Sequence, residues 1–207
     1  MWNDIDQNCD EWLDLRSGRV TGSAISKIMA NYGKAFGEPA KKYAVDIAIE
    51  MITGKPILSN YTNDHMERGH QQESIARMLY EGENFCDVSK GGFFDNGFTG
   101  CSPDGLIESE GVIEIKSVIP SVQYATLKRG APDPAYRWQL SFNLKESGRD
   151  WIDYVSFCAD FPDGKQLIIH RLTKDDLQDD FASIDNRLGD FRLLVDSIKN
   201  DIGDSHA

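Results

Sequence analysis

The chain has 207 residues and a formal net charge of −12, and charged side chains make up 27% of it. This length is enough for one sizeable hydrophobic core, so we expect a single domain over residues 1–207. The acidic balance argues against a protein that simply coats nucleic acid, because phosphate neutralisation supplies much of the affinity of such proteins. It permits an enzyme whose basic side chains are concentrated where one nucleic-acid strand binds, while the rest of its surface is negative.

The sequence shows no feature of an exported or membrane-inserted protein. No apolar run approaches the roughly 20 residues needed to cross a bilayer, and the acidic start of the chain lacks the basic and apolar regions of a signal peptide. Four widely spaced cysteines form no C-x-x-C pair: Cys9, Cys86, Cys101 and Cys158. This pattern predicts reduced thiols in a cytoplasmic protein rather than a disulfide framework or a zinc site.

The first part of the chain, about residues 1–85, has the pattern of helices. We expect them over residues 8–16, 24–30, from 38 to Gly54, and from Asn63 or Asp64 to just before Gly82. Ser23 is placed to cap the second of these helices, and Gly54 to end the third. Apolar residues at helical spacing predict buried stripes on the two longer helices: Tyr43, Ile47 and Met51, and Ile75, Met78 and Leu79.

The pattern then changes to that of short strands and turns, over about residues 86–172. Strands are expected over residues 91–94, 98–102, 106–107, 111–116, 152–158 and 166–172. Helices over residues 122–127 and 134–145 separate the last two strands from the others, and a long amphipathic helix over about 175–202 closes the chain. The order predicts an α/β (mixed α+β) fold, in which a central mixed β-sheet is flanked by helices.

Three charged residues within this sheet region have the chemistry of a metal-dependent hydrolase. Asp104 lies in a turn after a strand, and Glu114 and Lys116 follow ten and twelve residues later. Residues two apart in a strand share one face, so Glu114 and Lys116 point the same way while Ile115 points into the core. A hairpin can bring Asp104 beside Glu114, and two carboxylates suit Mg²⁺, which also binds water and substrate phosphate. The lysine can position or help to deprotonate a water molecule.

Each residue also has a simpler interpretation. Glu114 and Lys116 can be a charge pair on a solvated sheet face, and Asp104 can be an ordinary turn residue. Against this stands the apolar strand that carries the two charges, because burying a charge is costly unless something compensates for it.

Longer motifs around these residues resemble those of phage lambda exonuclease and the viral alkaline exonucleases, a family of the restriction-endonuclease-like PD-(D/E)XK nuclease superfamily. The similar segments are residues 11–23 (EWLDLRSGRVTGS), 69–77 (GHQQESIAR), 100–106 (GCSPDGL), Glu114-Ile115-Lys116, and 139–142 (QLSF). They occur in the family's order and cover roughly residues 11–142.

The resemblance implies a restriction-endonuclease-like core and a role for each matching residue. Asp104 and Glu114 are implied as metal ligands, with the backbone carbonyl of Ile115 as a third. Glu73 is implied on a flanking helix, ligating the metal directly or through water, and Lys116 as the residue that activates the nucleophilic water. Two Mg²⁺ ions are expected, for which Mn²⁺ can substitute.

The resemblance also implies a pocket for a 5′-phosphate formed by Arg16, Ser23 and Ser102, with Gln139 supporting the site or contacting DNA. An arginine and a serine at a helix N-terminus suit this role, because both can donate hydrogen bonds to phosphate. The simpler interpretations are an N-cap for Ser23, an ion pair of Arg16 with Glu11 or Asp14, and an exposed helical position for Gln139.

Other residues near these motifs have less defined expectations. His70 shares a helical face with Glu73, but the family pattern does not need it, so we expect a neighbour of the site rather than a ligand. Arg19 is either an added phosphate contact or a surface residue. Cys101 is expected to be a small buried residue. Since only Cys158 follows the core, the closely spaced cysteines of iron–sulfur nucleases are absent.

These motifs together predict a Mg²⁺-dependent processive 5′→3′ exonuclease that degrades one strand of linear double-stranded DNA. By resemblance it forms a ring-shaped homotrimer around DNA, is encoded by a phage or prophage in a bacterial host, and works with a single-strand annealing recombinase. Five basic residues are candidates to line the channel: Lys41, Lys42, Lys128, Arg129 and Arg137. The alternatives are a restriction- or resolvase-like endonuclease of the same fold, or a catalytically inactive DNA-binding or scaffold protein.

Overall fold

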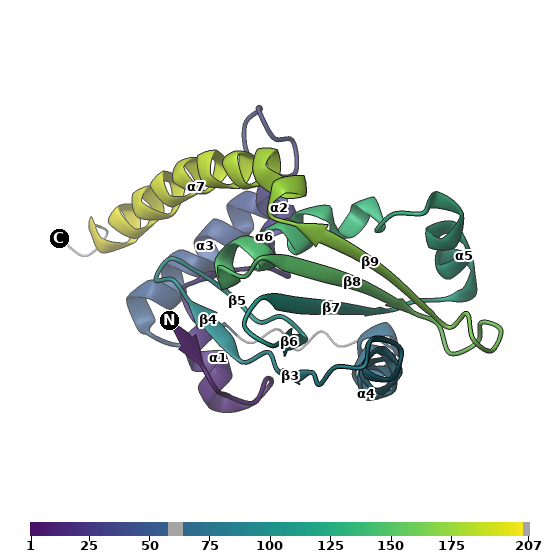
Figure 1. Cartoon of the computed structure of the whole chain (residues 1–207). Coiled ribbons are helices and arrows are strands. Elements are labelled where there is room, and N and C mark those ends of the chain that lie inside the picture. The colour runs from purple at the N-terminus through teal and green to yellow at the C-terminus, as the bar shows by residue number, and fades with distance from the viewer. Residues whose placement is uncertain (58–63, 205–207) are drawn as a thin grey trace.

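A five-stranded mixed sheet lies at the centre of the computed structural model, which describes the backbone of residues 1–57 and 64–204 and the side chains of residues 1–57 and 72–203. In spatial order its strands are β3 (Ser89–Lys90), β6 (Gly105–Ile107), β7 (Gly111–Ser117), β8 (Trp151–Phe157) and β9 (Leu167–Thr173). The pair β7–β8 is parallel and the other neighbours are antiparallel (Figure 1). The predicted mixed α/β fold is confirmed.

A second, smaller sheet lies beside the first and was not expected as a separate unit. Its order is β1 (Trp2–Asn3), β4 (Phe93–Asp95), β5 (Thr99–Cys101) and β2 (Val20–Thr21). β2 pairs in parallel with β5, with Val20 opposite Thr99, in a segment for which no strand was predicted. Two residues are too few to give an alternating pattern, so only the pairing partner identifies β2 as a strand.

Helices cover both faces of the five-stranded sheet (Figure 1). α4 (Asp64–Asn84) covers one face, where Ala76 and Tyr80 pack on alternate residues of β7 and β8. α6 (Arg137–Ser147) packs on the opposite face through Leu140 and Leu144. The sequence pattern predicted a stripe of Ile75, Met78 and Leu79 on α4. That prediction was wrong for Ile75 and Met78, which are exposed.

A helical layer packs against the small sheet and the outer side of α6. Its members are α2 (Ile25–Met29), α3 (Glu38–Thr53) and the long α7 (Gln178–Asp204). The short α1 (Asp10–Arg16) instead contacts β4 of the small sheet. Gly54 ends α3 in a left-handed conformation, as its sequence position predicted. Ile47 is buried in this layer, but Met51 is exposed, so the predicted stripe of α3 is narrower than expected.

The remaining helices connect the strands. α5 (Pro120–Arg129) follows β7, and two short 3-10 turns, η1 (Pro134–Tyr136) and η2 (Asp175–Leu177), precede α6 and α7. Both α5 and α6 end at a glycine in the left-handed conformation, Gly130 and Gly148, which frees the chain to turn into the next element. Within the described residues, no helix is long and apolar enough to cross a membrane.

An ion pair between Arg19, which precedes β2, and Asp95 at the end of β4 decides whether Arg19 is a phosphate contact or a surface residue. The guanidinium donates to both carboxylate oxygens of Asp95 at 2.8 Å, and both side chains are about a quarter exposed. Arg19 therefore serves the fold rather than the phosphate pocket. The hydrogen bonds from Arg19 lower the pKa of Asp95 below its ordinary value.

We expect Asp95→Asn to lower the free energy of unfolding by about 1–2 kcal/mol at pH 7, because it removes a bidentate charge-assisted pair. The folded-state pKa of Asp95 is lowered, so its stabilisation is present above the unfolded pKa of about 3.9 and is lost as the pH falls below it. Urea unfolding at pH 7 and pH 3 measures this. A difference between wild type and variant that is the same at both pH values would contradict it.

Candidate active site

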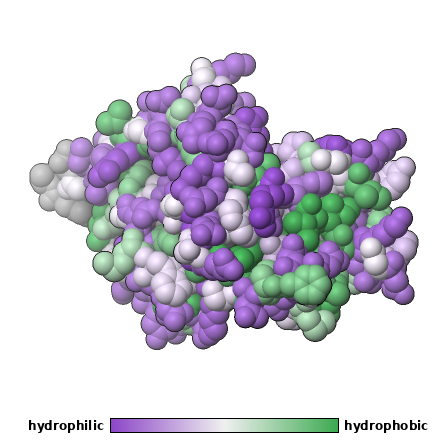
Figure 2. All heavy atoms as spheres, viewed as in Figure 1, coloured by the Kyte–Doolittle hydropathy of each residue, from purple (hydrophilic) through white to green (hydrophobic). Residues whose placement is uncertain are grey.

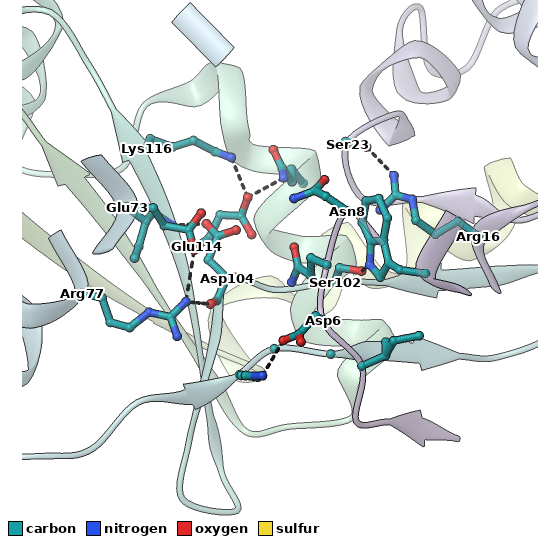
Figure 3. Close-up of a pocket in the computed structure, with 18 of the residues that line it drawn as sticks. Asp6, Asn8, Arg16, Ser23, Glu73, Arg77, Ser102, Asp104, Glu114 and Lys116 are labelled. Carbon is teal, nitrogen blue, oxygen red and sulfur yellow. Dashed lines mark hydrogen bonds and ion pairs between the residues drawn. The ribbon is translucent and has the colours of Figure 1, made fainter. Parts of the chain in front are cut away.

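One pocket of about 870 Å³ opens where the two sheets, α1, α4 and the start of α6 meet. Every residue for which the sequence predicted a site role lines it: Arg16, Ser23, Glu73, Ser102, Asp104, Glu114, Ile115, Lys116 and Gln139. Figure 3 shows the two groups facing each other across the pocket, with Lys116, Glu73, Glu114 and Asp104 on one side and Arg16 and Ser23 on the other. Segments about a hundred residues apart in sequence thus share one cavity.

The fold fixes Asp104 against the neighbouring strand β7. Its backbone N–H donates to the carbonyl of Ile113 at 3.1 Å, and one carboxylate oxygen accepts the N–H of Ile115 at 2.6 Å. The turn between β5 and β6 therefore brings this carboxylate beside Glu114, in the arrangement that the sequence predicted for a hairpin.

Glu114 lies on the face of β7 covered by α6, and only 2% of its side chain is exposed. One of its carboxylate oxygens, Oε1, accepts from Lys116 Nζ at 2.6 Å and from Gln139 Nε2. The other, Oε2, accepts from Asn143 Nδ2 at 2.8 Å. A carboxylate offers about four lone-pair sites, so these three donors hold it in place and leave room for one more partner.

The electrostatics of this cluster show an excess of negative charge. Burial raises the pKa of Asp104 well above its ordinary value, and the nearby carboxylate of Glu114 raises it further, while Lys116 acts in the opposite direction. Burial by itself would lower the pKa of Lys116, but the carboxylates of Glu114 and Asp104 outweigh it, and the pKa of the lysine is raised. Lys116 is therefore an ammonium group here, and its single charge does not offset the buried acids.

Glu73 approaches the same cluster from α4, and its environment differs from the expectation. Its carboxylate accepts from Arg77, one helical turn further on, at 3.1 Å. The same Arg77 nitrogen donates to the backbone carbonyl of Asp104. This arginine thus ties the helix to the Asp104 turn and holds Glu73 beside the pocket. The predicted neighbour of Glu73, His70, has its side chain outside the described residues.

The donor set fits a hard cation such as Mg²⁺. Asp104 and Glu114 supply carboxylate oxygens to the same pocket, which Ile115 also lines, and the backbone N–H of Ile115 donates to Asp104. Mg²⁺ is commonly bound by only one or two carboxylates, with water and substrate phosphate completing its shell. In the part of the chain whose side chains are described, no three histidine, cysteine, aspartate or glutamate residues form a ready-made metal cage.

The opposite wall of the pocket is built around Arg16 at the end of α1. Its guanidinium stacks on the Trp12 ring at 4.0 Å from the ring centre and lies 3.4 Å from the hydroxyl oxygens of Thr21 and Ser23. Burial lowers the pKa of Arg16 from its ordinary value. The alternative of an ion pair with Glu11 or Asp14 is thus replaced by stacking on an aromatic ring.

The two serines lie on the same wall. Trp12 Nε1 donates to the hydroxyl of Ser102 at 2.8 Å, so one tryptophan orients both the arginine and this serine. Ser23 was expected to cap the following helix, and this was wrong: α2 begins after Ala24, with no side-chain cap. The exposed Ser23 hydroxyl is directed to Arg16 instead, which leaves it available to a ligand (Figure 3).

Sequence reasoning gave no role to several residues that shape this pocket. Asn143 was missed although it lies four residues after Gln139 on α6, on the same helical face, and binds the same glutamate. Arg77 has the same spacing from Glu73, and this i,i+4 pairing was the available signal in both cases. Trp12 lies in the family-like segment 11–23 but was given no role. Cys101 is fully buried, as expected.

Comparisons with known proteins agree with this geometry. Residues 11–150 match the family model described as YqaJ-like viral recombinase domain. Among solved structures, the chain is similar to an alkaline exonuclease, LHK-Exo from Laribacter hongkongensis, with 27% identity, a TM-score of 0.78, and coverage of 95% of this chain and 99% of that one. A crystal structure of LHK-Exo in complex with dAMP matches equally well.

A more distant match shares the fold. A phage-related exonuclease from Haemophilus somnus 129PT is 15% identical, with a TM-score of 0.65 and coverage of 92% of this chain and 99% of that chain. No curated protein matches the sequence. The resemblance to the alkaline exonucleases noted in the sequence is thereby confirmed.

Proposed function

Because this chain belongs to the family of YqaJ-like viral recombinase domains, and hence to the phage-type alkaline exonucleases, we propose that it is a Mg²⁺-dependent 5′→3′ exonuclease. Its substrate is the end of linear double-stranded DNA, and its products are 5′-mononucleotides and a duplex with a 3′ single-stranded tail. The tail is the substrate of a single-strand annealing recombinase in phage-type homologous recombination.

One observation carries this proposal: an acidic cluster centred on the buried Glu114 and a wall that carries Arg16 and Ser23 face each other in a single pocket. An endonuclease must accept a continuous strand, whereas a pocket with its own phosphate-binding wall can measure from a terminal phosphate. A related exonuclease crystallises with dAMP, a 5′-mononucleotide. A nucleotide of this kind suits a pocket that joins phosphate-binding groups to a hydrolytic cluster.

The roles of the residues follow from their surroundings. Asp104, Glu114 and the Ile115 carbonyl would hold Mg²⁺, with Glu73 in reach as a further ligand or through water. When bound, the metal supplies Lewis-acid stabilisation of the phosphate charge and a more acidic water. Lys116, an ammonium group that donates to Glu114 at 2.6 Å and lies over the Tyr136 ring, donates to the attacking water to orient it and offsets the negative charge that develops on the phosphate. Arg16, Ser23 and Ser102 bind the 5′-phosphate, and Gln139 holds Glu114 in position.

We further propose that the protein acts processively as a ring-shaped homotrimer. A channel would reconcile DNA binding with the net charge of −12, because basic residues can face the DNA while acidic ones face outward. Of the five channel candidates, Arg137 already forms a bidentate pair with Asp180, so it is the least available for phosphate. A trimer mass from light scattering at micromolar protein supports this part of the proposal, and a monomer or dimer would contradict it.

The exonuclease proposal is tested with linear duplex DNA that carries either a 5′-phosphate or a 5′-hydroxyl at both ends. We expect release of 5′-mononucleotides in Mg²⁺, about 10²-fold faster from phosphorylated ends, and no cleavage of covalently closed circles. Equal rates on 5′-phosphorylated and 5′-hydroxyl substrates would overturn recognition of the terminal phosphate. Release of nucleotides from the 3′ ends would overturn the 5′→3′ direction. Cleavage of circles would show an endonuclease. No cleavage with either Mg²⁺ or Mn²⁺, and no rise in melting temperature on adding them, would show an inactive binding protein.

A further inference from the structure

The Asn143 side chain lies between Glu114, a proposed metal ligand, and Gly22, which precedes Ser23 of the proposed phosphate-binding wall. It is 1% exposed, and its Nδ2 donates to Glu114 Oε2 at 2.8 Å. Its other end, Oδ1, is buried and has no hydrogen-bond partner among the described residues. An unpaired buried amide oxygen is costly, so the position of this side chain calls for an explanation.

The orientation of the amide follows from its neighbour. An ionised glutamate only accepts hydrogen bonds, so the NH₂ group of Asn143 must face Glu114, and the oxygen must face the other way. The oxygen then meets the backbone of Gly22, between the β2 strand and Ser23 of the phosphate wall. A Cβ atom built on Gly22 would lie only 2.1 Å from Asn143 Oδ1 and 3.1 Å from Cγ.

The absence of a side chain at residue 22 is therefore what makes room for the asparagine. Gly22 is not in the left-handed region, so its backbone conformation does not require glycine. Residue 22 must be a glycine for a steric reason. The three atoms nearest to an added Cβ all belong to the Asn143 side chain. The segment Thr21–Gly22–Ser23 and the Glu114 carboxylate are thus both in contact with the rigid side-chain amide of Asn143.

We propose that Asn143 is a positioning residue that sets the orientation of Glu114 and couples it to the Thr21–Gly22–Ser23 loop. Movement of this loop when Ser23 and Arg16 bind a terminal phosphate is transmitted through the Gly22–Asn143 contact to the carboxylate that holds the metal. This inference rests on the proposed function, which assigns the metal to Glu114 and the terminal phosphate to Arg16 and Ser23. The contact itself is independent of that function.

The first test compares metal binding by wild type, Asn143→Ala and a matched control, using Mn²⁺ alone in a calorimetric titration without DNA. The control is Asn96→Ala, because Asn96 Nδ2 also donates to a glutamate, Glu146 Oε2, at 2.8 Å, and Glu146 is on α6 but outside the pocket. Loss of a group that orients a metal ligand commonly costs about 10–100-fold in affinity. We expect this loss for Asn143→Ala and a change of less than about twofold for Asn96→Ala. Equal effects of the two variants would overturn the proposal.

The second test is a double-mutant cycle with Gly22→Ala. In the wild-type background the new methyl group collides with Asn143 and displaces it, so we expect Mn²⁺ affinity and kcat to fall about as far as in Asn143→Ala. In the Asn143→Ala background the collision partner is gone, and Gly22→Ala should then cost less than about twofold. Additive losses in the two backgrounds would show that Gly22 and Asn143 act separately, and would overturn the coupling.

Two further readouts separate this role from a general loss of structure. Positioning of Glu114 predicts that Asn143→Ala lowers kcat while the KM for 5′-phosphorylated ends stays within about threefold of wild type. A raised KM with unchanged kcat would contradict it. The Mn²⁺ titrations and the melting temperatures of the four proteins in the cycle are informative even if the wild type degrades no DNA. In that case the proposed function fails while the cycle still tests the contact.

Discussion

Asp104→Asn is expected to abolish nuclease activity while leaving the metal-free protein as stable as the wild type or more stable. The carboxylate is buried next to Glu114, and burial together with that neighbour raises its pKa. A neutral amide of the same shape removes this unfavourable charge. It can keep the hydrogen bond from the Ile115 N–H, which is 2.6 Å long in the wild type, because an amide oxygen also accepts.

The loss of activity follows from the same charge. One of the two carboxylates proposed to hold Mg²⁺ directly becomes a neutral ligand, and metal-assisted hydrolysis depends on that metal for several kcal/mol of transition-state stabilisation. We expect kcat to fall by at least about 10³-fold, since each 1.36 kcal/mol corresponds to tenfold. The melting temperature without metal should rise by about 2–4 °C for each kcal/mol gained. The rise of melting temperature caused by 10 mM Mg²⁺ in the wild type should disappear.

Calorimetry and a nuclease assay on the same preparation check both parts. A variant that is inactive and several degrees less stable would mean that Asp104 is mainly structural. A variant that keeps full activity would remove it from the active site. Asp95→Asn, in the small sheet, is the matched control: it changes another partly buried aspartate, and it should lower stability and leave nuclease activity within about twofold.

The sequence predicted strand β7 well because its pattern is local. Alternation along residues 111–116 places Glu114 and Lys116 on one face and Ile113 and Ile115 on the other, and the structure packs the two isoleucines under α4. The turn at Asp104 and the glycine ends of the helices are equally local signals. In each case a few consecutive residues contain all the information needed.

What the sequence did not reveal depends on contacts between distant segments. β2 is a strand only because Val20 and Thr21 lie beside β5, and Ser23 leaves its capping role because α2 begins one residue later than expected. The exposed Ile75 and Met78 lie on a helix whose buried side is set by the small residue Ala76 and by Tyr80, which donates to Asp153. An apolar pattern cannot distinguish a buried stripe from an exposed one when the packed face uses an alanine and a tyrosine.

Arg16→Ala is expected to abolish the preference for 5′-phosphorylated ends. The arginine is the charged member of the wall formed with Trp12, Ser23 and Ser102, and its half-buried guanidinium is held against the Trp12 ring before the phosphate arrives. A pre-oriented guanidinium binds phosphate through two parallel hydrogen bonds. Hydrogen bonds to charged groups contribute about 1.5–3 kcal/mol each, so the variant should degrade 5′-phosphorylated duplex about 10²-fold more slowly.

The rate on 5′-hydroxyl ends gives the decisive comparison. Without a terminal phosphate the arginine has no ligand, so wild type and Arg16→Ala should degrade such ends at rates within about threefold of each other. If both substrates slow equally, Arg16 acts on the fold or on Lys116 and Glu114 rather than on the phosphate. Arg16→Lys should recover little of the loss, because an ammonium neither stacks in the same plane on Trp12 nor presents paired donors.

Trp12→Phe separates the two contacts of the tryptophan that supports this wall. A phenylalanine ring keeps an aromatic face under the guanidinium but loses the N–H that binds Ser102 at 2.8 Å. The preference for 5′-phosphorylated ends should therefore fall by only about tenfold, the value of one neutral hydrogen bond of about 1 kcal/mol plus a freed serine. A collapse as complete as that of Arg16→Ala would instead make the Ser102 hydroxyl the principal phosphate ligand. The preference for 5′-phosphorylated ends should therefore increase from Arg16→Ala to Trp12→Phe to wild type. This order would show that the arginine charge contributes more to end recognition than the Ser102 hydroxyl.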